Sequence, residues 1–145
     1  MKKFVLDSSV IVKFVNQDNE SNLDKTDQIL RDVQSGKVSL VSTELAKYEV
    51  GNALLKKGLT ISQAFQSLGT VSSLPIQFVP ETLEMARETY QMANEVRLSK
   101  DKKFTYYDAS FTALAKQEGA VLITDNPKHQ SKISGVKVVP LEKYK

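Results

Sequence analysis

Four acidic residues each lie in or directly after an apolar stretch of the sequence: Asp7, Glu49, Asp108 and Asp125. A carboxylate beside buried apolar residues is costly unless something pairs with it. If the four converge, they cannot all stay ionised without a counter-charge, and no Arg or His lies nearby in the sequence. The natural counter-charge is then a hard divalent cation with oxygen ligands, Mg²⁺ or Mn²⁺.

Such a cation site would suit the hydrolysis of phosphodiester bonds. Two ions about 3.5–4 Å apart can activate a water molecule and stabilise the leaving oxygen. This chemistry needs neither His nor Cys, and the chain has a single His and no Cys. The same composition argues against disulfides, thiolate metal sites, zinc sites and His-based triads.

Three of these acids also have an ordinary structural explanation. Asp7 fits a turn or helix N-cap, and Asp125 fits a turn before Pro127. Asp108 fits the last position of a capping box that begins at Thr105, although its helix face is apolar. Each residue taken alone leaves the structural and the functional interpretation open.

Glu49 has a different setting, because it lies in the middle of a predicted helix. The helical period places Leu45 and Ala53 beside it, so that Glu49 lies in a mostly apolar arc. Asn52 falls on the same side and is expected to orient the carboxylate. The alternative is an edge position paired with Lys56.

Alternating helices and strands must position these residues. We predict strands at about 3–7, 38–41, 75–79, 120–123 and 136–139. Helices are predicted at about 10–16, 22–35, 43–57, 60–72, 80–97 and 105–118, with a short one from 127. We expect Ser8 or Ser9 to cap the first helix, Pro80 to open the fifth, and a polar tail to follow residue 139. This order predicts one α/β domain over residues 1–145, with a central, mainly parallel sheet flanked by helices on both faces.

The charge distribution is mildly basic. The net charge is +3 and the isoelectric point about 9.0, which permits an anionic partner. Lysines gather at Lys100, Lys102 and Lys103 and near Lys128, although a solvated surface explains each cluster equally well. No apolar run approaches the roughly 18 residues of a membrane span, and no signal peptide is evident, so we expect a cytoplasmic protein without a membrane partner.

Four short motifs resemble those of the PIN-domain nucleases in order and spacing. They are Val5-Leu-Asp7-Ser-Ser9, Tyr48-Glu49-Val-Gly-Asn52-Ala-Leu, Tyr107-Asp108-Ala and Ile123-Thr124-Asp125. The closest resemblance is to the VapC-type toxins of type II toxin–antitoxin pairs, over essentially the whole chain. It implies a metal-dependent endoribonuclease that acts on RNA, forms a homodimer and is inhibited by a cognate antitoxin protein.

The resemblance also assigns roles to individual residues. Asp7, Glu49, Asp108 and Asp125 would be the catalytic quartet around Mg²⁺ or Mn²⁺, and Ser9, Asn52 and Thr124 would orient them. Asn126 stands where many family members carry a further acid, which argues against a second tightly bound ion. To this we add our own expectation that Lys100, Lys102, Lys103 and Lys128 flank the cleft and hold RNA phosphates.

Two other functions remain open at this point. One is a non-catalytic α/β binding module in which the acids are caps and surface charges. The other is a PIN nuclease with a housekeeping role in RNA processing. A haloacid-dehalogenase-type phosphatase would need a second Asp where Ser9 stands, and a dinucleotide-binding fold would need a G-x-G-x-x-G that is missing after the first strand.

Overall fold

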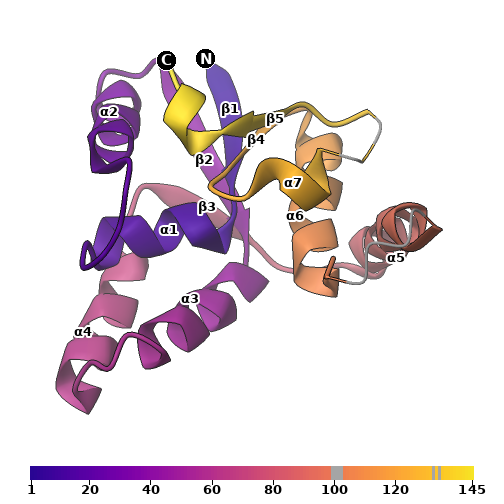
Figure 1. The fold of residues 1–145 in the computed structure, drawn as a ribbon. Helices are drawn as coiled ribbons and strands as arrows, with labels where there is room; N and C mark the ends of the chain where they lie inside the picture. The colour runs from indigo at the N-terminus through magenta and orange to yellow at the C-terminus, as the bar shows by residue number, and fades with distance from the viewer. Residues whose placement is uncertain (99–102, 132, 134) are drawn as a thin grey trace.

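The computed structural model describes residues 1–98, 103–131, 133 and 135–145, and its chain path is drawn in Figure 1. In this part of the chain five strands form one sheet: β1 (Lys2–Leu6), β2 (Val38–Thr43), β3 (Ile76–Val79), β4 (Val121–Thr124) and β5 (Val138–Pro140). Their order across the sheet is β3-β2-β1-β4-β5, and all four neighbouring pairs are parallel. The predicted α/β class and parallel sheet are confirmed.

Helices cover both faces of this sheet. They are α1 (Ser8–Val15), α2 (Leu23–Gln34), α3 (Leu45–Leu55), α4 (Ile61–Val71), α5 (Leu83–Leu98), α6 (Tyr106–Glu118) and α7 (Pro127–Gln130). In Figure 1, α1 to α4 lie on one side of the sheet, and α6 lies on the other side with α5 outside it. No helix within the described residues is long and apolar enough to cross a membrane.

The core forms where the apolar runs of the central strands meet the helices. Val5 and Leu6 of β1 and Ile123 of β4 are completely buried. One long stretch of α6, residues 109–115, is buried as well, because this helix packs between the sheet and α5. Burial on both faces explains why these strands read as continuous apolar runs.

The start of α1 differs from the sequence prediction. Its N-cap is Asp7, whose carboxylate accepts a hydrogen bond from the backbone N–H of Val10, so neither Ser8 nor Ser9 caps the helix. Asp is as good an N-cap as Ser, and the first strand simply ends one residue earlier than expected. The residue that begins the helix is therefore also the first of the four candidate acids.

Two other boundaries were also predicted wrongly. The helix expected from Pro80 begins at Leu83, because the Thr82 hydroxyl accepts the N–H of Met85 and acts as the cap.

The expected polar tail is a 3₁₀ turn, Leu141–Lys143, followed by the buried Tyr144. Leu141 is fully buried, and the Tyr144 ring meets Phe4 edge-on at 5.6 Å between centroids. Leu141 and Tyr144 are isolated among charged residues and give no periodic signal, so this packing could not be predicted from the sequence.

Candidate active site

The carboxyl ends of β1 and β4 form one edge of a cavity. These strands are parallel neighbours, so the residues that follow them, Asp7 and Asp125, emerge side by side. Glu49 reaches the cavity from α3, and Asp108 reaches it from the first turn of α6. The cavity has a volume of about 560 Å³ and its described lining is Asp7, Ser8, Ser9, Glu49, Asp108, Asp125, Asn126, Pro127, Lys128 and Gln130. The structure thus brings all four predicted acids to one site.

Asp7 is the most deeply buried of the four acids, and donors surround its carboxylate. Oδ1 accepts from the Ser9 hydroxyl and the Val10 N–H, and Oδ2 accepts from the Thr124 hydroxyl and from Gln130 Nε2 at 3.4 Å. Burial raises the pKa of Asp7, and these hydrogen bonds oppose the rise without cancelling it. The geometry fixes this carboxylate at the end of β1.

Two of the predicted orienting residues, Ser9 and Thr124, also hold the segment that carries Asp125. Ser9 Oγ accepts the backbone N–H of Asp125 at 3.0 Å, and Thr124 Oγ1 accepts the N–H of Asn126 at 3.1 Å. Each hydroxyl therefore donates a hydrogen bond to Asp7 and accepts one from a backbone N–H just after β4. These contacts are those expected of orienting residues.

Glu49 is half-buried and its partner differs from the predicted one. The carboxylate accepts a hydrogen bond from the Ser8 hydroxyl at 3.0 Å, whereas Asn52 is exposed on the outer side of α3. Among the described residues, no hydrogen bond joins Asn52 to Glu49, so the expected orienting contact is not formed in this structure. No ion pair joins Glu49 to Lys56 within the described residues. Ser8 was overlooked, although its place directly after Asp7 puts it at the same strand end.

The electrostatic environment of Glu49 is unfavourable for its charge. Burial raises its pKa to about 7, and the negative charges of Asp108 and Asp7 add to the rise, while the Ser8 hydrogen bond lowers it. The carboxylates of the cavity are therefore close enough to repel one another.

Asp108 both caps α6 and lines the cavity. Its Oδ2 accepts the backbone N–H of Thr105 at 3.0 Å, and the Thr105 hydroxyl accepts the N–H of Asp108 at 3.1 Å. This is the predicted capping box at the start of α6. Asp108 also lines the cavity, so the cap holds the carboxylate at its edge.

A buried lysine lies beside the acids, which the sequence argument about counter-charges overlooked. Lys13 of α1 has a side chain that is 0% exposed, and its Nζ lies 3.1 Å from Asp125 Oδ2. A Lys within an apolar helix is usually expected to reach solvent, so its charge was not expected beside the acids. One acid of the cavity, Asp125, is therefore paired with a buried cation that it shares with Glu20.

Gln130 of α7 is a second residue that the sequence analysis missed. Its side chain is buried at the cavity and donates to Asp7, and its Oε1 has no hydrogen-bond partner within the described residues.

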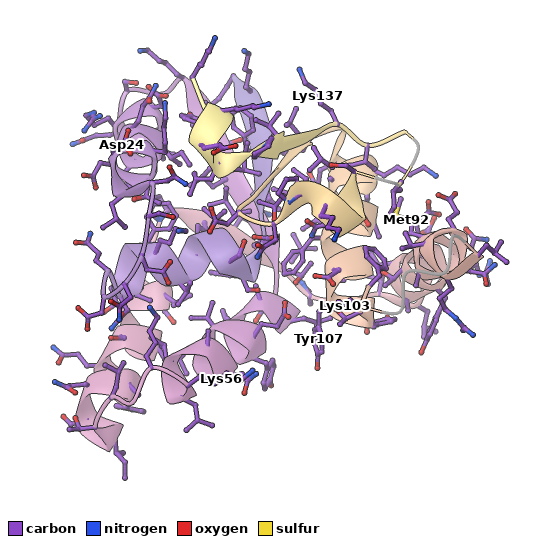
Figure 2. All side chains as sticks on the ribbon, in the orientation of Figure 1. Asp24, Lys56, Met92, Lys103, Tyr107 and Lys137 are labelled. Atoms are coloured by element: carbon purple, nitrogen blue, oxygen red, sulfur yellow. The ribbon has the colours of Figure 1, made fainter. Side chains whose placement is uncertain are left out.

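Of the predicted RNA-binding lysines, Lys128 is exposed and lines the cavity. Lys103 is exposed in the segment before α6 (Figure 2) and is not among the described lining residues. Lys100 and Lys102 lie outside the described residues.

Comparison with known proteins identifies the family. The family model described as PIN domain matches residues 4–135. The chain belongs to the PIN domain family. No curated protein matches the sequence significantly.

Solved structures share the fold of this PIN domain at low sequence identity. VapBC2 from Rickettsia felis, bound to a DNA fragment from its promoter, is 14% identical with a TM-score of 0.71, covering 95% of this chain and 98% of its own. A toxin–antitoxin complex from Klebsiella pneumoniae is 18% identical with a TM-score of 0.60, covering 94% and 96%. VapC20 from Mycobacterium tuberculosis, a toxin that cleaves the sarcin–ricin loop, is 12% identical with a TM-score of 0.64, covering 92% and 98%.

The donor set of this PIN domain suits a hard divalent cation. Carboxylate and hydroxyl oxygens dominate the cavity, and these are the ligands that Mg²⁺ and Mn²⁺ prefer. Within the described residues, no three acidic or His side chains already form a closed metal-binding group. Burial, together with the negative charges of Asp108 and Asp7, raises the pKa of Glu49, and a bound cation would offset both effects, so the residues fit the ion.

We expect Glu49→Gln to stabilise the metal-free PIN domain at pH 8. The folded-state pKa of Glu49 is raised from 4.5 to about 7, so its favourable contribution is present below about pH 4.5 and lost as the pH rises through 7. Gln removes that loss and still accepts from Ser8. Allowing for solvent screening of a partly exposed group, the gain is about 1 kcal/mol. Urea denaturation in EDTA at pH 5 and pH 8 measures it, and an equal effect at both values would contradict the prediction.

Proposed function

We propose that this PIN domain is an endoribonuclease that depends on Mg²⁺ or Mn²⁺ and is the toxin of a toxin–antitoxin pair. The observation that supports the proposal best is the convergence of four carboxylates from four separate segments on one cavity. The acids follow β1 and β4 or lie on inward sides of α3 and α6. Membership of the PIN domain family and the fold shared with VapC20 are consistent with this function.

Asp7, Glu49, Asp108 and Asp125 are the residues that we propose hold the cation. A bound divalent cation supplies a water of lowered pKa and stabilises charge on a phosphate. The protein's own part is to fix these oxygens. Ser9 and Thr124 hold Asp7, and Ser8 holds Glu49.

The approach of RNA requires positive charge at the rim, since an acidic cavity repels phosphates. Lys128 is exposed at the cavity, where its ammonium can meet a phosphate that enters. Lys103 lies just before the helix that carries Asp108, and we propose that it contacts RNA further from the scissile bond. Lys100 and Lys102 would extend the same contact.

The toxin assignment implies partners. The Klebsiella pneumoniae relative is a toxin–antitoxin complex, and we propose by analogy that a cognate antitoxin protein inhibits this chain. We also propose that the chain acts as a homodimer in the cytoplasm, where both RNA and the antitoxin would reach it.

Removal of the metal ion tests the proposed activity. We expect pooled cellular RNA to be cleaved in Mn²⁺ or Mg²⁺, the rate to fall by at least about 10²-fold in EDTA, and the activity to return when Mn²⁺ is restored. Asp24→Asn is a suitable control, because this exposed acid on α2 does not line the cavity (Figure 2). Cleavage that persists in EDTA would contradict metal dependence. A folded, inhibitor-free chain that neither cleaves RNA nor binds Mn²⁺ would favour the non-catalytic binding module.

A further inference from the structure

A completely buried ammonium group lies behind the acidic cavity. Lys13 Nζ donates to the Ser21 carbonyl at 2.8 Å and lies 3.1 Å from both Glu20 Oε2 and Asp125 Oδ2. A lysine has three N–H donors, and these three oxygens satisfy all of them. Lys13 is therefore fixed in position, unlike a lysine on the surface.

The contacts of Lys13 continue into a chain of alternating charges. Glu20 Oε1 lies 3.0 Å from Lys57 Nζ, and Lys57 donates to the Asp18 carbonyl at 2.7 Å. Asp125, Lys13, Glu20 and Lys57 thus sum to zero charge. They connect the end of β4 to α1, to the segment between α1 and α2, and to the chain just after α3.

This arrangement restricts how Asp125 can serve the cavity. Its Oδ2 pairs with Lys13, and its backbone N–H is held by the Ser9 hydroxyl. Among the described residues no contact is made by Asp125 Oδ1, so this oxygen can face a ligand in the cavity. Lys13 itself does not line the described cavity, so its ammonium acts from inside the protein through Asp125.

We propose that Lys13 is a positioning residue that fixes Asp125 and neutralises its charge from behind, so that the cavity binds one divalent cation and not two. This inference rests on the proposed metal-dependent function. A single divalent ion placed between Asp125 and the other acids is attracted by the negative charges of Asp7, Glu49 and Asp108. A second ion beside Asp125 would lie within a few ångströms of a fixed, desolvated ammonium, where like charges repel strongly.

Titration of the metal-free chain (residues 1–145) with Mn²⁺, followed by calorimetry, tests the proposal without measuring activity. We expect wild type to bind one Mn²⁺. Lys13→Met removes the competing positive charge, so we expect a dissociation constant lower by roughly fivefold to tenfold, or a second bound ion. Glu20→Gln leaves Lys13 less neutralised, so we expect weaker Mn²⁺ binding by roughly the same factor.

A charge-matched control separates local from global electrostatics. Lys116→Met changes the net charge by the same amount as Lys13→Met, but Lys116 is on α6 and pairs with Glu88. We expect its Mn²⁺ dissociation constant to stay within about twofold of wild type, since exposed charges are screened. A lysine that only supports the fold would not shift affinity in opposite directions for Lys13→Met and Glu20→Gln.

The outcomes distinguish this inference from the proposed function. If Lys13→Met does not fold, the weaker binding of Glu20→Gln still supports the proposal. Two Mn²⁺ ions bound by wild type, or unchanged affinity in both folded variants, would overturn the role of Lys13 while leaving a metal-dependent nuclease intact. A wild type that neither binds Mn²⁺ nor cleaves RNA would overturn the proposed function and, with it, this inference.

Discussion

The Asp108→Asn variant is expected to cleave RNA at least about 10²-fold more slowly than wild type while keeping its fold. Asn removes one negative charge from the cavity where the cation is proposed to bind. It keeps an oxygen that can accept the Thr105 N–H, so the capping box of α6 survives. Initial rates of RNA cleavage in Mn²⁺, together with a melting temperature, measure both parts of the prediction.

The control for Asp108→Asn must separate its cap from its place in the cavity. Thr105→Ala removes the hydroxyl that accepts the Asp108 N–H, which typically costs about 1 kcal/mol of stability. We expect this variant to melt earlier and to cleave RNA at nearly the wild-type rate. If Thr105→Ala lost as much activity as Asp108→Asn, the acid would act through the helix end alone.

The second large effect is expected from Lys13→Met on stability. Breaking a buried ion pair by removing one partner typically costs about 3–5 kcal/mol. Asp125 is partly exposed and Glu20 keeps Lys57, so we expect the free energy of unfolding to fall by about 3 kcal/mol, the lower end of that range. Two carboxylates, Glu20 and Asp125, lose their shared cation. Urea denaturation of the metal-free chain at pH 7 measures the change.

The double variant Lys13→Met/Asp125→Asn tests where that cost arises. Glu20 keeps its ion pair with Lys57, so Asp125 is the carboxylate left without a cation. Asn at position 125 removes that charge, and the double variant should therefore recover part of the lost stability. Strictly additive losses would mean that Lys13 and Asp125 are not coupled. A Lys13→Met variant within about 0.5 kcal/mol of wild type would contradict the burial of the ion pair.

The sheet could be predicted from the sequence because its strands are buried on both faces. Segments such as Phe4-Val5-Leu6 and Val121-Leu122-Ile123 read as strands without any alternation to interpret. The boundaries that failed were set by single hydrogen bonds. Asp7 caps α1 in place of a serine, and Thr82 delays α5 past Pro80.

The sequence predicts the four acids of the candidate site, but not the residues that contact them. The sequence pattern shows that an acid directly follows a strand or lies on the apolar side of a helix. This is why Asp7, Glu49, Asp108 and Asp125 could be assigned to one site. The partners come from tertiary contact. Lys13 and Gln130 meet Asp125 and Asp7 only after β1 and β4 have paired, so no spacing in the sequence points to them.

Asn52 failed for a related reason. Helical periodicity reports which residues share a side, but it does not report how wide the buried stripe is. On α3 the covered stripe includes Glu49 only in part, and Asn52 falls beyond it. The hydroxyl of Ser8, from a different helix, takes the place that we had assigned to Asn52.

The pairing of β1 with β4 also affects when the cavity can arise during translation. Asp7 and the Thr124 hydroxyl that holds it are 117 positions apart in the chain. Until β4 leaves the ribosome, one edge of the central strand has no neighbour, and the first acid has none of its β4 contacts. Contacts between such distant segments form late in folding. A growing or prematurely terminated chain would therefore carry Asp7, Glu49 and even Asp108 without a complete site, and only synthesis past Asp125 would complete it.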